Sequence, residues 1–321
     1  MDVFALRESL VEQYASFARS FTEIRAPDIA TQVAKAYDEG RFWPDPLVQI
    51  NPRFKDGKSV AELVDDGTLH PRCRDLFDLR LYLHQEFAIA LAQKGASYVV
   101  TTGTGSGKSL CFFIPIVDAA LRAKDADPTK RTRAIVIYPM NALANSQQEE
   151  LRRYLGVNGP VTFARYTGQE SQEERERIRQ DPPDILLTNF MMLELLMTRQ
   201  SPLDKAVIDN CRGLSFLVLD ELHTYRGRQG ADVAMLVRRV RERLADDRLQ
   251  CVGTSATMAS DAGQDNSNQR VADVASRIFA TAISPFDVVT EDLKRATDSS
   301  ETHETVRDRL GPAIDAGIHS N

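Results

Sequence analysis

The sequence has few residues of the kinds that build metal clusters, disulfide frameworks or membrane spans. It contains four cysteines among 321 residues, all scattered, with no Cys-x-x-Cys pair. This argues against a zinc site and a disulfide framework and suits a reducing compartment. No window approaches the apolar run of about 20 residues that a membrane span needs, and the first residues do not resemble a signal peptide. We therefore expect a cytoplasmic protein with no membrane partner.

The overall composition is that of an ordinary globular protein and leaves the binding partner open. Hydrophobic residues make up 42% and charged residues 27%, with a net charge of −6. An acidic total does not exclude nucleic acid, because such binding needs only a local basic surface. Two basic clusters occur, and for each a binding surface and a solvated face both stay open. They comprise Lys124, Lys130, Arg131 and Arg133, and Arg238, Arg239, Arg241 and Arg243.

Three regions follow one another along the chain. Residues 1–79 show helical signals, among them the capping-box pattern of Ser59 and Glu62, and we expect a helical accessory region there. Residues 80–285 alternate between short apolar runs and amphipathic stretches and form the main domain. Residues 286–321 have few large apolar side chains, so we expect a linker or a weakly ordered tail.

The main domain has the pattern of an α/β fold. Strands and helices alternate with short turns, which predicts a mostly parallel sheet with helices on both faces. In such sheets the functional loops gather at the carboxyl ends of the strands. The expected strands are 97–101, 134–138, 161–166, 184–188, 216–220 and 249–253, and the expected helices include 141–155, 189–199 and 230–244.

A glycine-rich segment, TTGTGSGKS, follows the first of these strands at residues 101–109. Its glycines allow the backbone N–H groups to turn inward around phosphate, with a helix N-terminus behind them. Lys108 would then reach the β- and γ-phosphates of ATP, and the Ser109 hydroxyl would hold Mg²⁺. The predicted nucleotide loop comprises Thr102, Gly103, Thr104, Gly105, Ser106, Gly107, Lys108 and Ser109.

Two carboxylates directly follow an apolar strand. In the segment FLVLDELH, residues 216–223, Asp220 and Glu221 come immediately after four apolar residues. Carboxylates at the edge of a dry core are costly unless a partner or a metal compensates them. A magnesium nucleotide does so if Asp220 supplies a ligand to Mg²⁺ and Glu221 orients and deprotonates the water that attacks the γ-phosphate.

These features occur in the order found in a known family. Residues 220–223 resemble motif II of the superfamily 2 helicases of the DExH type, and SAT at 255–257 resembles their motif III. Residues 81–91 are similar to the segment whose glutamine, here Gln85, reads adenine. The family's phosphate loop commonly begins with Ala or Thr, which accounts for Thr102. The run DELHTYRG is similar to that of large bacterial helicases, which include mitomycin-type DNA repair and phage-defence helicases.

Further motifs imply where nucleic acid and the coupling residues lie. Residues 138–147, 166–168 and 186–194 resemble family segments that touch the nucleic-acid backbone. The resemblance implies phosphate contacts through backbone N–H groups and short polar side chains, although the same residue types are ordinary in turns and caps. It also implies that His223 links ATP to motif III. The implied contacts are Pro139, Asn141, Gln147, Thr167, Gly168, Thr188 and Asn189, and the implied coupling residues are Ser255, Ala256 and Thr257.

Two further groups of residues indicate a function less specifically than the motifs do. Tyr225, Arg226 and Arg228 follow the acid pair, and they either link ATP to nucleic acid or belong to an ordinary surface loop. We expect core positions rather than a ligand surface for three methionines, Met191, Met192 and Met197.

The resemblance covers residues 80–283 and implies a RecA-like domain that binds ATP and Mg²⁺. Motors of this family use two RecA-like domains, and the second carries an arginine finger, which is worth about 10³–10⁵ in rate in related phosphoryl transfer. After residue 257 the sequence shows no second set of strand–helix repeats, so we expect slow hydrolysis by this chain alone. The implied partners are single-stranded or partly duplex DNA, a second RecA-like domain, and repair or phage-defence proteins.

Three functions have to be separated. The leading one is the motor of an ATP-dependent DNA helicase or translocase. The second is an ATP-dependent clamp or recruitment subunit that binds DNA without separating its strands, and it would use the same motifs. A P-loop ATPase of another class is disfavoured, because a transporter ATPase needs an L-S-G-G-Q-like signature and a kinase does not need motif III.

Overall fold

The computed structural model describes residues 3–20, 24–39, 53–103, 105–156, 159–256 and 264–294. Contacts divide the chain into two units, Met1–Asn51 and Pro52–Asn321. In the first unit the described residues form two helices, α1 (Val3–Ser20) and α2 (Pro27–Asp38). The second unit holds the α/β domain and the motifs that the sequence predicts.

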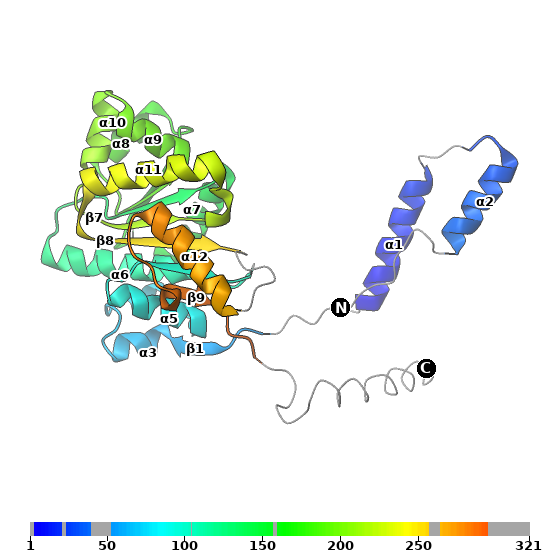
Figure 1. Cartoon of the computed structure of the whole chain (residues 1–321), viewed down its shortest axis with the longest axis horizontal. Coiled ribbons are helices and arrows are strands. Elements are labelled where there is room, and N and C mark those ends of the chain that lie inside the picture. Colours follow the sequence, from blue (N-terminus) through cyan, green and yellow to red (C-terminus); the bar gives the residue numbers. More distant parts are fainter. Residues whose placement is uncertain are drawn as a thin grey trace. The chain divides into compact units, whose positions relative to one another are not determined.

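Seven strands form the main sheet of the second unit (Figure 1). Their order is β5-β6-β4-β7-β8-β3-β9, and neighbouring strands pair in parallel throughout. The predicted mostly parallel α/β sheet is therefore confirmed. The strands are β3 (Tyr98–Thr101), β4 (Ala134–Tyr138), β5 (Phe163–Tyr166), β6 (Ile185–Asn189), β7 (Leu214–Leu219), β8 (Ala245–Ser255) and β9 (Val288–Thr290).

Helices cover both faces of this sheet, with an apolar core on each side. One core includes Phe112 of α6 and Leu151 of α7, and the other includes Leu236 of α11 and Phe279 of α12. No helix among the described residues is long and apolar enough to cross a membrane. The helices are α5 (Leu83–Gln93), α6 (Leu110–Ala126), α7 (Asn141–Leu155), α8 (Gln172–Gln180), α9 (Phe190–Thr198), α10 (Pro202–Asp209), α11 (Gly227–Leu244) and α12 (Gln264–Phe279).

The parallel pairing brings the predicted motifs to one edge of the sheet. Thr101, just before the glycine-rich loop, pairs with Ser255 of β8 and with Thr290 of β9. Leu219, just before the acid pair, pairs with Gly253 of β8. The phosphate loop, the acid pair and the start of motif III therefore lie on three adjacent strands at their carboxyl ends.

Part of the expected accessory region belongs to the α/β unit. Val60, Leu63 and Phe77 are buried in the same core as Phe112, although we placed the domain boundary at residue 79. The predicted capping box is present, with the Ser59 hydroxyl accepting from the Glu62 N–H at 3.2 Å. The elements of this segment are β1 (Asp56–Ser59), α3 (Val60–Asp65), α4 (Cys73–Leu76) and β2 (Arg80–Tyr82), with β1 and β2 antiparallel.

The expected tail also begins inside the sheet. A short 3-10 turn, η2 (Pro285–Asp287), leads into β9, where Val288 and Val289 are buried. Phe54 and Leu293 then form an antiparallel bridge. Residues 295–321 lie outside the described part of the chain.

Both basic clusters are engaged by acids or carbonyl oxygens of the fold. Lys124 pairs with Asp184 at 2.5 Å, and Arg241 donates to the carbonyl oxygen of Phe279 at 3.1 Å. These contacts favour a role in holding loops and helices over a basic surface for nucleic acid.

Candidate functional site

The glycine-rich loop connects β3 to α6 and depends on left-handed glycines. Gly105 has φ 78° and Gly107 has φ 70°, conformations that L side chains rarely adopt. Lys108 Nζ donates to the carbonyl oxygens of Thr102 at 3.0 Å and Gly103 at 3.1 Å. The lysine therefore closes over its own loop, as a side chain that binds phosphate at this position must be able to do.

The first part of the loop contacts a carboxylate from the far end of the chain. The Gly103 N–H donates to Glu291 Oε2 at 2.6 Å. Beside it, the hydroxyls of Thr102 and Ser106 lie 2.6 Å apart, and both side chains are buried. An anion of the protein itself thus occupies one N–H group of the predicted phosphate loop.

Gln85 contacts the loop from α5. Its Oε1 accepts from the Tyr82 N–H at 2.9 Å, and its Nε2 donates to the Gly107 carbonyl oxygen at 3.0 Å. His84 brings Nε2 within 2.9 Å of the Ser106 carbonyl oxygen. Both ends of the Gln85 amide therefore have partners in the fold, and its role in reading adenine stays a prediction.

The acid pair follows β7 and is positioned by the neighbouring strand. The Thr254 hydroxyl donates to Asp220 Oδ1 and accepts from the Glu221 N–H at 3.1 Å. Glu221 has φ 54°, a left-handed conformation that is uncommon outside glycine and occurs often at functional sites. Thr254 therefore holds the Asp220 carboxylate and the Glu221 backbone at the edge of the sheet.

The charges of this pair are incompletely compensated. Burial raises the pKa of Asp220, and the nearby Glu221 adds to the rise, while Thr254 and Lys108 oppose it. Glu221 Oε2 is buried and accepts no hydrogen bond from the described residues. A cation placed here would favour the charged carboxylates, so the pair fits a magnesium nucleotide.

The metal would arrive with phosphate rather than sit in a site made by the chain alone. Among the described residues, no group of three His, Cys, Asp or Glu side chains could hold a metal ion. Ser109 lies at the start of α6 with a partly exposed side chain. Together with Asp220, its hydroxyl could complete the coordination of an ion already bound to phosphates.

His223 joins the acid pair to motif III. Its Nδ1 lies 3.1 Å from Ser255 Oγ and 3.2 Å from Glu221 Oε2, the latter an ion-pair contact rather than a hydrogen bond. The structure thus brings His223 and Ser255 together, although their coupling role stays a prediction. Two further predicted residues lie outside the described part of the chain, Thr104 and Thr257.

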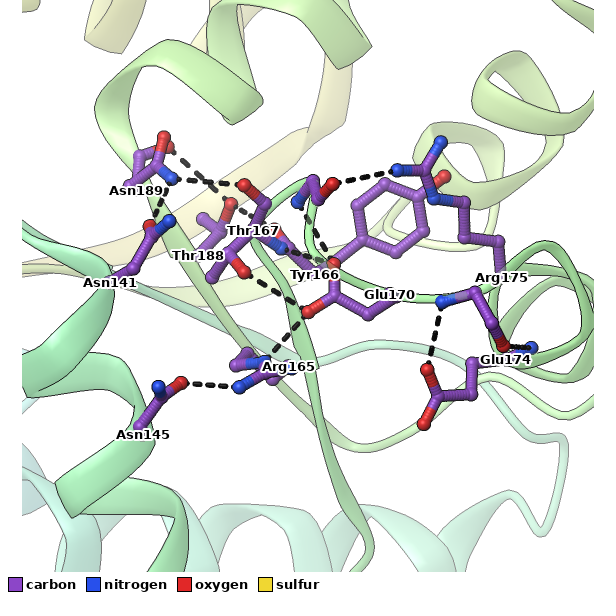
Figure 2. A network of polar contacts seen from close by, with 12 residues as sticks. Asn141, Asn145, Arg165, Tyr166, Thr167, Glu170, Glu174, Arg175, Thr188 and Asn189 are labelled. Atoms are coloured by element: carbon purple, nitrogen blue, oxygen red, sulfur yellow. Dashed lines mark hydrogen bonds and ion pairs between the residues drawn. The ribbon is translucent and has the colours of Figure 1, made fainter.

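Three of the predicted nucleic-acid residues form a hydrogen-bonded group at the carboxyl ends of β4, β5 and β6. Asn189 Nδ2 donates to Asn141 Oδ1 at 2.6 Å and to the Thr167 carbonyl oxygen at 3.2 Å (Figure 2). Asn189 Oδ1 accepts from the Met192 N–H at 2.7 Å and so caps α9. Pro139 lines the same surface pocket as Asn141 and Asn189.

Glu170 organises the turn that contains Thr167 and Gly168 (Figure 2). Its carboxylate accepts from the N–H groups of Thr167 at 2.8 Å and Gly168 at 2.9 Å, and from Arg165 Nε at 2.7 Å. Glu170 therefore occupies both N–H groups, and a nucleic-acid phosphate would have to displace its carboxylate to use them. The predicted backbone contacts of Thr167 and Gly168 stay predictions.

Thr188 differs from the prediction, whereas the predicted contact of Gln147 stays a prediction. Thr188 is fully buried, and its hydroxyl donates to the Tyr166 carbonyl oxygen at 2.7 Å. It joins β6 to β5 and offers no surface to DNA, which corrects its predicted direct contact. Gln147 is half-buried on α7, and its Oε1 has no hydrogen-bond partner among the described residues.

Three side chains that shape the site were not found from the sequence. Thr254 lies 34 residues from Asp220, and Glu291 lies 188 residues from Gly103. Glu170 is close to the turn that it holds, but a single acid in a polar loop forms no motif. The one usable signal was the position of Thr254 directly before the predicted motif III.

Comparison with known proteins agrees with this geometry. The family model described as DEAD/DEAH box helicase matches residues 82–264. The chain belongs to this helicase family. The matched residues include the phosphate loop, the acid pair and Ser255, so the chain holds the family's ATP-binding motor domain. The predicted resemblance to superfamily 2 helicases is confirmed.

Relatives of this helicase domain are larger proteins. The "Uncharacterized ATP-dependent helicase YprA" of Bacillus subtilis (strain 168) is 32% identical over 215 residues, which cover 66% of this chain and 27% of YprA. The "Druantia protein DruE" of Escherichia coli (strain UMEA 4076-1) is 25% identical over an alignment of 336 residues, gaps included. This alignment covers 67% of this chain and 18% of DruE.

A solved structure shows the same fold. A crystal structure of the DUF1998 helicase MrfA bound to DNA has a TM-score of 0.57 at 25% identity, covering 75% of this chain and 31% of that chain. The RecA-like fold is confirmed by this likeness. The chain spans less than a third of the length of each of these three proteins.

Proposed function

We propose that the chain is the ATP-binding motor of an ATP-dependent DNA helicase or translocase that works with a second RecA-like domain. The observation that carries the proposal is the acid pair, which is incompletely compensated and lies on the same sheet edge as the phosphate loop. Such a pair suits a site that receives a cation together with phosphates.

Each residue of this edge then has a role. Lys108 and the loop N–H groups bind the phosphates of ATP, while Ser109 and Asp220 hold Mg²⁺. The bound ion neutralises charge that develops on the phosphates. Glu221 orients the attacking water and accepts its proton. His223, through Ser255, connects this reaction to motif III.

The choice of DNA as substrate rests on relatives. MrfA was solved bound to DNA, and DruE is a Druantia protein. Asn141 and Asn189 are half-buried and line a surface pocket at the sheet edge, which supports contact with a single strand. DNA repair or phage-defence proteins are the partner classes that follow from these likenesses.

The test is ATP hydrolysis by the full-length protein with and without single-stranded DNA, followed by strand displacement from a tailed duplex. We expect stimulation by the single strand and displacement that requires ATP. Stimulation without displacement would favour the clamp or recruitment function. An ATPase indifferent to DNA would overturn the proposal.

A further inference from the structure

A surface pocket of about 530 Å³ lies where the loops after β4 and β6 meet the start of α11. It shares Pro139, Asn141 and Asn189 with the predicted nucleic-acid contacts. Its volume is within the range of small-molecule pockets, about 300–1,000 Å³. The pocket is therefore large enough for a group that projects from a bound strand.

The mouth of this pocket is apolar and solvent-accessible. Met140 is 60% exposed and Met191 is 62% exposed, and Phe190 lies beside them. We predicted a core position for Met191, but only its neighbour Met192 is buried, at 4% exposed. Thioether side chains are polarizable and make favourable contacts with aromatic rings. An aromatic ligand would thus find suitable walls here.

The polar groups of the pocket are unsuited to phosphate. Among the described residues that line it, none is a lysine or an arginine, and Asp232 contributes a carboxylate. A phosphate would be repelled by this acid, whereas an exocyclic amino group of a base can donate to it. The amides of Asn141 and Gln229 add further donors and acceptors. Exposed Arg226 and Arg228 follow Tyr225 outside the lining, where backbone phosphates can be held.

The inner wall of the pocket includes Tyr225, which a short 3-10 turn joins to the acid pair. Tyr225 is 3% exposed, and its hydroxyl is buried with no partner among the described residues. In the turn η1 (Leu222–Thr224) the Thr224 N–H donates to the Glu221 carbonyl oxygen at 2.9 Å, and the Tyr225 N–H donates to the Leu222 carbonyl oxygen at 3.1 Å. A buried hydroxyl without a partner is costly, and such groups are often found where a ligand or a water completes the site.

We propose that this pocket receives one nucleobase of the bound strand and that Tyr225 transmits its presence to Asp220 and Glu221. The inference rests on the proposed function, because it requires a nucleic acid at this edge of the sheet. Contacts with the phosphates of the strand then fix its path, while the pocket binds a base and so distinguishes a strand with bases from one without them. A base in contact with the Tyr225 ring and hydroxyl shifts this side chain, and the 3-10 turn passes the shift to Glu221 and so promotes hydrolysis.

The experiment compares two probes of equal length, an oligodeoxycytidylate and a strand with the same phosphates but abasic sugars. Affinity and ATPase stimulation are measured for the full-length protein and for a Met140→Ala, Met191→Ala double variant. The matched control is Met235→Ala, since Met235 is 59% exposed on α11 but does not line the pocket. Melting temperatures verify that all variants are folded.

We expect the wild type and the Met235→Ala control to prefer the base-bearing strand. The double variant should lose roughly 2- to 10-fold of that preference, the range that a sulfur–aromatic contact gives, while its affinity for the abasic strand is unchanged. Tyr225→Phe should lower stimulation by the base-bearing strand toward that given by the abasic strand.

Two results would overturn the nucleobase pocket. One is a double variant that loses affinity for both strands equally, which would mean that the pocket contacts the backbone. The other is a double variant with full preference for bases. A wild type that binds neither strand would instead remove the proposed function, and the pocket with it.

Discussion

Glu170 and Asp220 are carboxylates in loops at the same edge of the sheet, but their surroundings have opposite effects on them. For Glu170, burial raises the pKa, yet Arg165 and the backbone N–H groups outweigh it, so the pKa lies below its ordinary value. For Asp220, burial outweighs the Thr254 hydrogen bond and Lys108, so the pKa lies above its ordinary value. One acid is fully satisfied by the fold, and the other is not.

This difference is the one expected between an acid that holds the fold and an acid that binds a ligand. Glu170 receives its donors from within its own loop and from Arg165, and it shapes the turn without any ligand. Asp220 has one hydroxyl donor and a second carboxylate as its neighbour. A group held in this way gains most from an added cation. The phosphate loop lies at the same edge of the sheet. A cation bound to ATP would therefore arrive next to Asp220.

The largest expected effect concerns Glu221, the predicted general base of the pair. Glu221→Gln in the full-length protein should reduce ATP turnover by about 10²–10⁴-fold, the usual contribution of a general base, with ATP binding retained. Steady-state hydrolysis and nucleotide binding are the measurements. Glu173→Gln, on the exposed side of α8, is the matched control. ATP turnover close to that of the control would show that Glu221 is not the general base.

Removal of Glu170, whose carboxylate has its donors within the fold, should instead lower the free energy of unfolding. Glu170→Ala leaves Arg165 and two N–H groups without their acceptor, and we expect a loss of about 3 kcal/mol in the free energy of unfolding. Glu173→Ala should change it by less than about 0.5 kcal/mol. Denaturant unfolding of this chain measures both.

The pH dependence of that loss has a definite sign. The pKa of Glu170 is lowered on folding, so its contribution is complete above the unfolded value of 4.5 and is lost as pH falls through the folded value. The difference between wild type and Glu170→Ala should therefore shrink in acid. A difference that stays constant down to pH about 3 would show that the charge of Glu170 is irrelevant.

For Asp220 we expect the opposite dependence of stability on pH. Its pKa is raised on folding, so the wild type loses stability as pH rises from the unfolded value of 3.8 through the folded value. Asp220→Asn removes this loss and keeps an acceptor for Thr254. We expect a melting temperature about 2–4 °C higher at neutral pH, the shift that about 1 kcal/mol produces in a domain of this size, and no gain in acid. A lower melting temperature at neutral pH would contradict the assignment.

The smallest effect concerns Glu291. Because its carboxylate accepts from the Gly103 N–H, phosphates must displace it to use that donor. Glu291→Ala removes the competing acceptor and should tighten ATP binding by about 2- to 10-fold, which corresponds to one hydrogen bond of ordinary net strength. Titration with a fluorescent ATP analogue measures the change, and Asp292→Ala, on an exposed neighbour, serves as the control.

The sequence was most informative where the signal is local. Continuous apolar runs predicted six of the parallel strands, because strands buried on both faces contain little else. β9 was missed because three residues, Val288 to Thr290, are too few to stand out from a polar tail. The loop and the acid pair were found because phosphate and Mg²⁺ chemistry requires fixed residue types in a fixed order.

Tertiary pairings were out of reach of the sequence. Thr188 lies in a motif but is fully buried, since β6 is covered on both faces of the sheet. Met191 and Met192 are adjacent on α9, and helical spacing places only one of them in the core. The donors to Glu170 depend on how one turn folds back, which composition does not determine.

The most direct test of the central claim is the effect of Mg²⁺ on ATP affinity, measured for this chain, for Asp220→Asn and for Glu170→Gln. If Asp220 is the acid that awaits a cation, Mg²⁺ should tighten ATP binding to the wild type and to Glu170→Gln, and this tightening should be largely lost in Asp220→Asn. Equal tightening by Mg²⁺ in all three proteins would show that Asp220 is not the magnesium ligand.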